Sequence, residues 1–240
     1  MVELSPALRS LAIVAVFGVA ALAAAPDASA SPVLVRDGNG GNVFNGNGVG
    51  SVNLTINVDG ANKGVAAGPF ALQYSTNGGS SWLDLLTYCL EPDETLNVGG
   101  TPTSGDLVAS VSAAPEYAAK AGDIARLYRT YFADSLTTAT KGAAFQVAMW
   151  EVAYDTGKNL AAGAFRLVTT GAVATQAAAY LGGWMPSGDV GVILRVGNQD
   201  LLVDNPGGVP VPEPVSLALF GLGLAGLGLA RARGRRPNAA

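Results

Sequence analysis

Apolar segments stand near both ends of this 240-residue chain, and they confine the folded part to the residues between them. The first runs from Leu11 to Ala25 and the second from Val215 to Ala230. The second holds sixteen residues, which at about 1.5 Å per residue is somewhat less than a hydrocarbon core of roughly 30 Å. Four arginines follow it, and positive charge marks the cytoplasmic end of a membrane segment. We therefore expect one folded domain outside the inner membrane.

The second apolar segment lies between a short motif and a basic end. The residues that carry this pattern are Pro212, Glu213, Pro214, Arg231, Arg233, Arg235 and Arg236. Their order resembles the PEP-CTERM sorting signal of bacterial envelope proteins that are processed by exosortase. Over residues 209–240, the resemblance implies cleavage near the motif, an inner-membrane intermediate, and transfer to the outer envelope or the extracellular matrix. The alternative is a plain C-terminal anchor that contains a chance Pro-Glu-Pro.

The N-terminal segment is consistent with export. Arg9 precedes the first apolar run, and Ala28-Ser29-Ala30 has the small-x-small pattern of a signal-peptide cleavage site. We expect residues 1–30 to be a signal peptide and residues 31–208 to form the exported domain, which is long enough for a single core.

Histidine is absent from the chain. Its absence excludes histidine acid–base catalysis, Ser-His-Asp triads and ordinary zinc sites. Between Ser31 and Val211, nine Lys and Arg stand against fifteen Asp and Glu, and this acidity argues against nucleic acid as a partner. The loop from Asp37 to Gly50 begins like a calcium site but lacks the distal glutamate. We expect no metal, no cofactor and no enzymatic turnover.

The single cysteine, Cys89, is unusual for an exported chain. Cysteines in oxidising compartments normally pair with each other. One thiol forms no internal disulfide, so it must be free, joined to another molecule, or protected by some other covalent bond.

Alternating apolar and polar residues predict strands in the first half of the domain. The alternation is strict from Val52 to Val58 and is repeated from Phe70 to Tyr74. A turn at Asn77-Gly78-Gly79 leads to a strand around Trp82–Leu90, and Cys89 lies near its end.

The pattern then changes to helical spacing and back again. The Gly/Pro/Thr stretch 99–105 is predicted to be a loop. Helices are predicted for residues 115–131, for 140–155 with Gly157 as the stop, and for 172–181. Strands are predicted for 190–196 and 201–203. This order indicates an α+β fold: a β-sandwich or barrel-like sheet with an inserted helical block, flanked by an N-terminal signal helix and a C-terminal membrane helix.

The second predicted helix carries an unusual group of side chains. Gln146, Trp150 and Tyr154 are spaced at i, i+4 and i+8 and so share one face. A carboxamide on a largely apolar helix costs free energy when buried, unless it is hydrogen-bonded. The sequence therefore predicts a partner for Gln146.

Tyr88-Cys89 on a strand, followed by Gln146 to Trp150 on a later helix, resembles the thioester domains of bacterial surface adhesins. The resemblance implies that Cys89 supplies the sulfur and Gln146 the acyl carbon of an internal thioester, with Tyr88, Ala148 and Trp150 at matching motif positions. Two residues depart from the family pattern. Phe145 replaces a threonine and Met149 a branched aliphatic residue.

Elementary chemistry is compatible with this resemblance. A thiolate attacks a carboxamide held beside it and expels ammonia, and aromatic cover from Trp150 and Tyr154 would slow hydrolysis. The partner would be a surface or matrix molecule that bears an amine or hydroxyl group. Two alternatives remain: a non-covalent surface protein with an inert buried cysteine, and a carbohydrate-active hydrolase that uses paired carboxylates such as Glu91 and Glu151.

Overall fold

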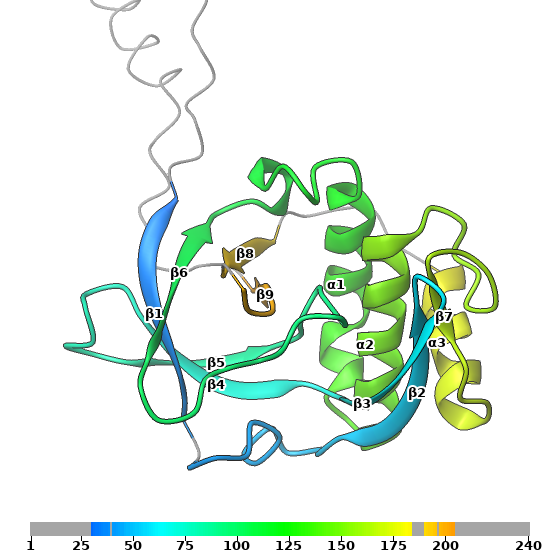
Figure 1. Ribbon diagram of the computed structural model, residues 1–240, viewed down its shortest axis with the longest axis horizontal. Helices are drawn as coiled ribbons and strands as arrows, with labels where there is room; N and C mark the ends of the chain where they lie inside the picture. Colours follow the sequence, from blue (N-terminus) through cyan, green and yellow to red (C-terminus); the bar gives the residue numbers. More distant parts are fainter. Residues whose placement is uncertain (1–29, 39, 184–189, 196, 205–240) are drawn as a thin grey trace, which may run out of the picture. The chain divides into compact units, whose positions relative to one another are not determined.

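The computed structural model describes residues 30–38, 40–183, 190–195 and 197–204 (Figure 1). The sorting tail and the signal peptide, apart from Ala30, lie outside these ranges. Within them, no helix combines the length and the apolar character needed to cross a membrane.

The larger sheet is antiparallel throughout and has the strand order β5-β4-β1-β6-β8-β9. Its strands are β1 (Ser31–Asp37), β4 (Phe70–Ser75), β5 (Leu83–Thr87), β6 (Thr103–Val108), β8 (Gly191–Leu194) and β9 (Leu201–Val203). A smaller sheet of order β3-β2-β7 contains β2 (Val52–Val58), β3 (Ala61–Ala67) and β7 (Phe165–Leu167).

The larger sheet is almost closed by the segment that follows β5. The amide of Leu202 donates to the carbonyl of Tyr88 at 3.0 Å, and the amide of Leu90 donates to the carbonyl of Asp200 at 3.0 Å. Between these two bonds, Cys89 forms a bridge with Leu201 in β9. The sheet is therefore barrel-like, and the cysteine lies at the seam where its two edge strands meet.

Three helices lie between β6 and β8 in the chain: α1 (Ala121–Ser135), α2 (Ala139–Tyr154) and α3 (Ala172–Gly182). Every residue of α2 from Gly142 to Val152 is buried, because α1, α3 and the smaller sheet all contact this helix. Figure 1 shows the helices beside the six-stranded sheet, with the strands of the smaller sheet across α2. A helix enclosed on all sides is largely apolar all round, and Gln146 and Glu151 are the charged or amide-bearing exceptions between Gly142 and Val152.

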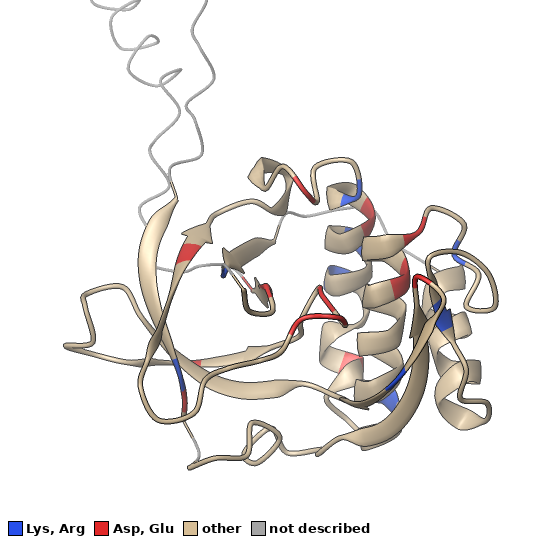
Figure 2. Ribbon diagram, viewed as in Figure 1, with Lys and Arg blue, Asp and Glu red and all other residues tan. Residues whose placement is uncertain are grey.

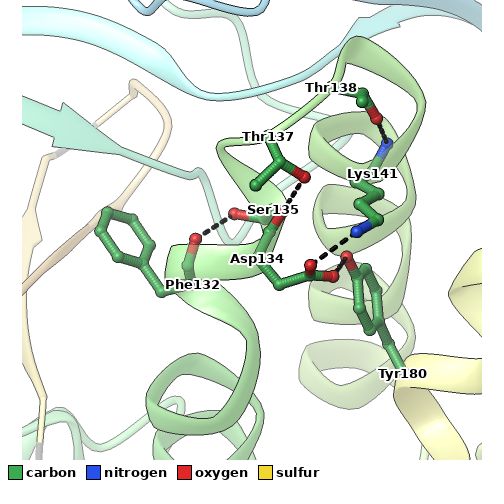
Figure 3. Close-up of polar contacts among 7 residues, drawn as sticks. All are labelled: Phe132, Asp134, Ser135, Thr137, Thr138, Lys141 and Tyr180. Atoms are coloured by element: carbon green, nitrogen blue, oxygen red, sulfur yellow. Dashed lines mark hydrogen bonds and ion pairs between the residues drawn. The ribbon is translucent and has the colours of Figure 1, made fainter.

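The turn between α1 and α2 is fixed by a polar cluster (Figure 3). The carboxylate of Asp134 accepts hydrogen bonds from Lys141 Nζ at 2.6 Å and Tyr180 Oη at 2.7 Å. Thr138 caps α2, since its hydroxyl accepts the amide of Lys141 at 3.2 Å. Ser135 Oγ donates to the carbonyl of Phe132 at 2.6 Å. This cluster joins α1, α2 and α3.

The predicted α+β class with an inserted helical block is confirmed, and its sheet is the barrel-like form of the prediction. Several boundaries were wrong. The predicted loop over 99–105 ends earlier than expected, because β6 begins at Thr103. The strand predicted over Trp82–Leu90 ends at Thr87, and only the bridge at Cys89 continues it. The first helix begins at Ala121 rather than Pro115. The second ends at Tyr154, where Asp155 and not Gly157 follows as the cap.

Candidate functional site

Cys89 and Gln146 lie against each other in the interior. The carboxamide of Gln146 bonds both backbone groups of Cys89: its Oε1 accepts the Cys89 amide at 3.2 Å, and its Nε2 donates to the Cys89 carbonyl at 2.8 Å. Cys89 is 0% and Gln146 1% exposed. The Gln146 side chain thus bonds the amide and the carbonyl of Cys89, as the backbone of a neighbouring strand would.

The predicted helix face points at the same segment. The Trp150 indole donates from Nε1 to Cys89 Sγ at 3.3 Å, and the Tyr154 hydroxyl donates to the carboxylate of Asp93. Three side chains at intervals of four residues along α2 thus contact the segment from Cys89 to Asp93: Gln146, Trp150 and Tyr154. Tyr154 contacts the loop after Cys89 and makes no hydrogen bond with the cysteine itself.

Tyr88 and Ala148 have different surroundings. The Tyr88 hydroxyl donates to Ser135 Oγ at 2.8 Å, and its ring centroid lies 4.7 Å from that of Phe145. Tyr88 therefore packs among the helix aromatics, where Phe145 fills a fully buried position. Ala148 is buried in α2. Both residues are part of the buried core, and within the described ranges neither has a hydrogen bond to Cys89 or Gln146.

The thiol is strongly protonated at neutral pH. Burial raises the pKa of Cys89 to about 12, against the hydrogen bonds from Trp150 and from the Glu91 backbone, which lower it. The nearby negative charge of Glu91 adds to the increase in pKa.

A cleft of about 650 Å³ reaches Cys89. The loop after β5 from Pro92 to Gly99, β3 from Lys63 to Ala66, and the loop from Gly41 to Phe44 form most of its lining. Cys89 and Trp150 are also part of the lining. The cleft leads to the cysteine, although water does not contact Cys89 in this conformation.

A second set of polar residues lies beside the cleft and was not predicted from sequence. Asp200, 5% exposed, accepts the hydroxyl of Tyr117 at 2.9 Å and the amide of Arg195 at 2.7 Å. The carboxylate of Glu91 accepts the Asp200 amide at 3.0 Å. Burial and the negative charge of Asp200 raise the pKa of Glu91 to about 7. Glu91 is therefore held to the segment before β9 by a hydrogen bond.

The two carboxylates of the hydrolase alternative are held by different segments. Glu91 bonds the amide of Asp200, and Glu151 accepts the amide of Asn159 at 2.6 Å. Burial raises the pKa of Glu151 to about 7. Neither carboxylate bonds the other, and the described ranges contain no group of three or more side chains suited to a metal ion.

The sorting residues lie outside the described ranges, and comparison with known proteins addresses them directly. Residues 210–236 match the family model of the PEP-CTERM protein-sorting motif. No curated protein and no solved structure matches the chain significantly. The motif covers Pro212 to Arg236 of the predicted tail, and it implies export, sorting to the cell surface and processing by exosortase.

Proposed function

We propose that this exported envelope protein carries an internal thioester between Cys89 and Gln146 and uses it to acylate a partner surface. The observation that supports the proposal best is the pairing of the Gln146 carboxamide with Cys89, while Trp150 contacts the sulfur at 3.3 Å. We assign residues 1–30 to the signal peptide, 31–208 to the acylating domain and 209–240 to the sorting tail.

Formation of the bond conserves atoms without an oxidant. The Cys89 sulfur attacks the Gln146 carboxamide carbon, a C–S bond forms, and the C–N bond breaks. The amide nitrogen leaves as ammonia and takes the thiol proton. An amine or hydroxyl group then attacks the same carbon, the C–S bond breaks, and the proton of the acceptor returns to sulfur. The Gln146 side chain is consumed, so the protein reacts once and is no enzyme.

The protein must overcome two obstacles to form the bond. A primary amide is a poor acyl donor, and the high pKa of Cys89 keeps the thiolate scarce at neutral pH. Fixed proximity offsets part of this barrier, by about 7–11 kcal/mol when the geometry is good. The indole N–H of Trp150 favours negative charge on sulfur. Burial of both residues keeps water from the finished thioester.

Intact-mass spectrometry of the mature protein tests this proposal. We expect a mass lower by one ammonia than the mature sequence requires, and stoichiometric addition of methylamine at Gln146. Gln146→Ala, which keeps the thiol but has no acyl group, is the control and should show neither effect. An unmodified mass, together with free alkylation of Cys89 under native conditions, would reject the thioester. The same spectrum reports removal of the leader and of the tail.

The alternative is a non-covalent surface or matrix protein in which Cys89 is inert. It is favoured by the fact that the Gln146 carboxamide already has a partner at both ends, which is how buried amides are usually satisfied. Under this alternative, Cys89→Ala leaves retention of the protein in the envelope or matrix unchanged. Under the thioester proposal, Cys89→Ala and Gln146→Ala abolish covalent retention equally.

A further inference from the structure

The cleft that reaches Cys89 has an excess of negative charge. Its lining includes the carboxylates of Asp37, Asp93 and Glu94 and a single basic side chain, Lys63. Figure 2 shows the acidic stretch of the loop after β5, from which two of these carboxylates come. Glu94 is exposed, and the Asp93 carboxylate, which also accepts the Tyr154 hydroxyl, retains capacity for further bonds. Charge alone does not define a site.

A buried amide in the same lining gives the second observation. Gln199 is 9% exposed, and its Nε2 donates to the carbonyls of Glu91 at 3.2 Å and Glu94 at 2.9 Å. These two bonds fix which end of the amide carries nitrogen. Its Oε1 is buried and has no donor among the described residues. A buried carbonyl oxygen without a donor is costly, so an N–H group from a ligand would satisfy it.

The remaining lining suits an organic cation better than a metal ion. Phe44, Phe70 and Trp150 contribute aromatic rings to the cleft, and aromatic faces attract ammonium and guanidinium groups. A metal ion would need several converging hard ligands, and the described part of the chain has no group of three or more acidic, histidine or cysteine side chains placed to supply them.

We propose that this cleft binds an ammonium or guanidinium group on a flexible chain of a partner molecule. Gln199 Oε1 accepts one N–H of the cation, and the carboxylates of Asp93 and Glu94 neutralise its charge. The binding is non-covalent and does not depend on the thioester. A partner held in this way would have its cationic end in the cleft that leads to Cys89.

Calorimetric titration of the full chain with butylguanidinium tests the site. Guanidinium stays protonated at neutral pH and is not a nucleophile, so acylation does not contribute to the signal. Butylurea has the same shape without the charge. We expect saturable binding of butylguanidinium that weakens with added salt, and at least tenfold weaker binding of butylurea. Equal binding of the two compounds, or binding of neither, would overturn the proposal.

Matched variants separate the cleft from the overall charge. Glu94→Gln should weaken butylguanidinium binding about threefold to fivefold, whereas Asp106→Asn, an exposed residue outside the cleft with the same charge change, should have no effect. Lys63→Gln should tighten binding by a similar factor. Gln199→Leu should weaken it about tenfold, with an unchanged circular dichroism spectrum as the check on folding. Equal effects of Glu94→Gln and Asp106→Asn would show a general charge effect and contradict the site.

Discussion

The α1–α2 junction and the cleft at Cys89 are both built from polar side chains, but they satisfy those side chains differently. At the junction, Asp134 has a cationic and a hydroxyl partner in Lys141 and Tyr180 (Figure 3). Beside the cleft, Gln199 Oε1 and two nitrogen atoms of Arg195 are buried without a partner among the described residues. The junction uses its hydrogen-bonding capacity within the fold, and the cleft keeps part of its capacity unused.

One short segment serves both regions. Tyr88 extends toward the junction and donates to Ser135, and the next residue, Cys89, contacts Gln146 and Trp150. Alternation of side chains along an extended segment produces this division. At the junction Asp134 is paired with Lys141 and Tyr180, whereas among the described residues Gln199 Oε1 has no partner beside the closure of the sheet. Variants in each region test this distinction.

The largest effect is expected for Gln146→Leu. Loss of the carboxamide leaves the amide and the carbonyl of Cys89 buried without their side-chain partner. At about 1–3 kcal/mol for each of the two groups, unfolding should become easier by about 2–6 kcal/mol in urea titrations. The control is Gln73→Leu, since Gln73 bonds Arg36 and Asp84 on a partly exposed face. Its cost should be about 1 kcal/mol or less. Equal costs would show that the carboxamide has no special structural role.

A pH dependence follows from Glu91. Folding raises the pKa of Glu91 from an ordinary value of 4.5 to about 7. Between pH 4.5 and pH 7, the carboxyl is therefore protonated in the native protein and ionised in the unfolded chain. Stability should therefore fall as pH rises through this window, by about 1–2 kcal/mol after allowance for solvent screening. Glu151 contributes in the same direction, so Glu91→Gln should reduce the slope without abolishing it.

Asp134 at the junction gives the opposite slope. Hydrogen bonds from Lys141 and Tyr180 lower the pKa of Asp134 below its ordinary value of 3.8. The contribution of Asp134 to the free energy of unfolding is fully present above its ordinary pKa of 3.8. This contribution is lost as the pH falls from 3.8 through the lower pKa of the native protein. Unfolding titrations from pH 3 to pH 8 should show both slopes. Stability that rises between pH 4.5 and pH 7, with no change on Glu91→Gln, would contradict the buried state of this carboxyl.

The fold was predictable from sequence where a pattern is local and long. The alternation over Val52–Val58, the helical pattern over 140–155 and the alanine-rich stretch 172–181 predicted elements that the structure contains. Strand β3 was missed because Ala61–Ala67 has no apolar alternation and is ordered by pairing with β2. Strand β7 has three residues, too few to show a period. Such strands are set by their neighbours and not by their own residues.

The same limit applies to the site. Gln146, Trp150 and Tyr154 share a face because of helix geometry alone, so sequence brought them together. Gln199 and Asp200 bond Glu91 across 108 and 109 residues, and only the closure of the sheet creates these contacts. The free oxygen of Gln199 has no local signal in the sequence.

A moderate effect is expected for Tyr88→Phe, which removes the hydrogen bond from Tyr88 to Ser135 at the α1–α2 junction. Ser135 Oγ still donates to Phe132, so only one buried hydrogen bond is lost. Unfolding should become easier by about 1 kcal/mol. Native alkylation of Cys89 in the Gln146→Ala background should keep its rate. A large increase in that rate would show that the junction and the cleft are coupled through the segment.

The smallest effect is expected for Lys141→Met, which breaks the 2.6 Å ion pair with Asp134. Both side chains are about one third exposed or more, and such pairs contribute about 0.5 kcal/mol because solvent screens them. Lys158→Met is the matched control, since its 3.6 Å contact with Asp123 is longer and equally exposed; its removal should cost less. Salt should reduce both effects. A loss above about 2 kcal/mol for Lys141→Met alone would mean that Tyr180 and Asp134 depend on the lysine as one cooperative network, and the junction would then resemble the buried pair at Cys89 more than an exposed cap.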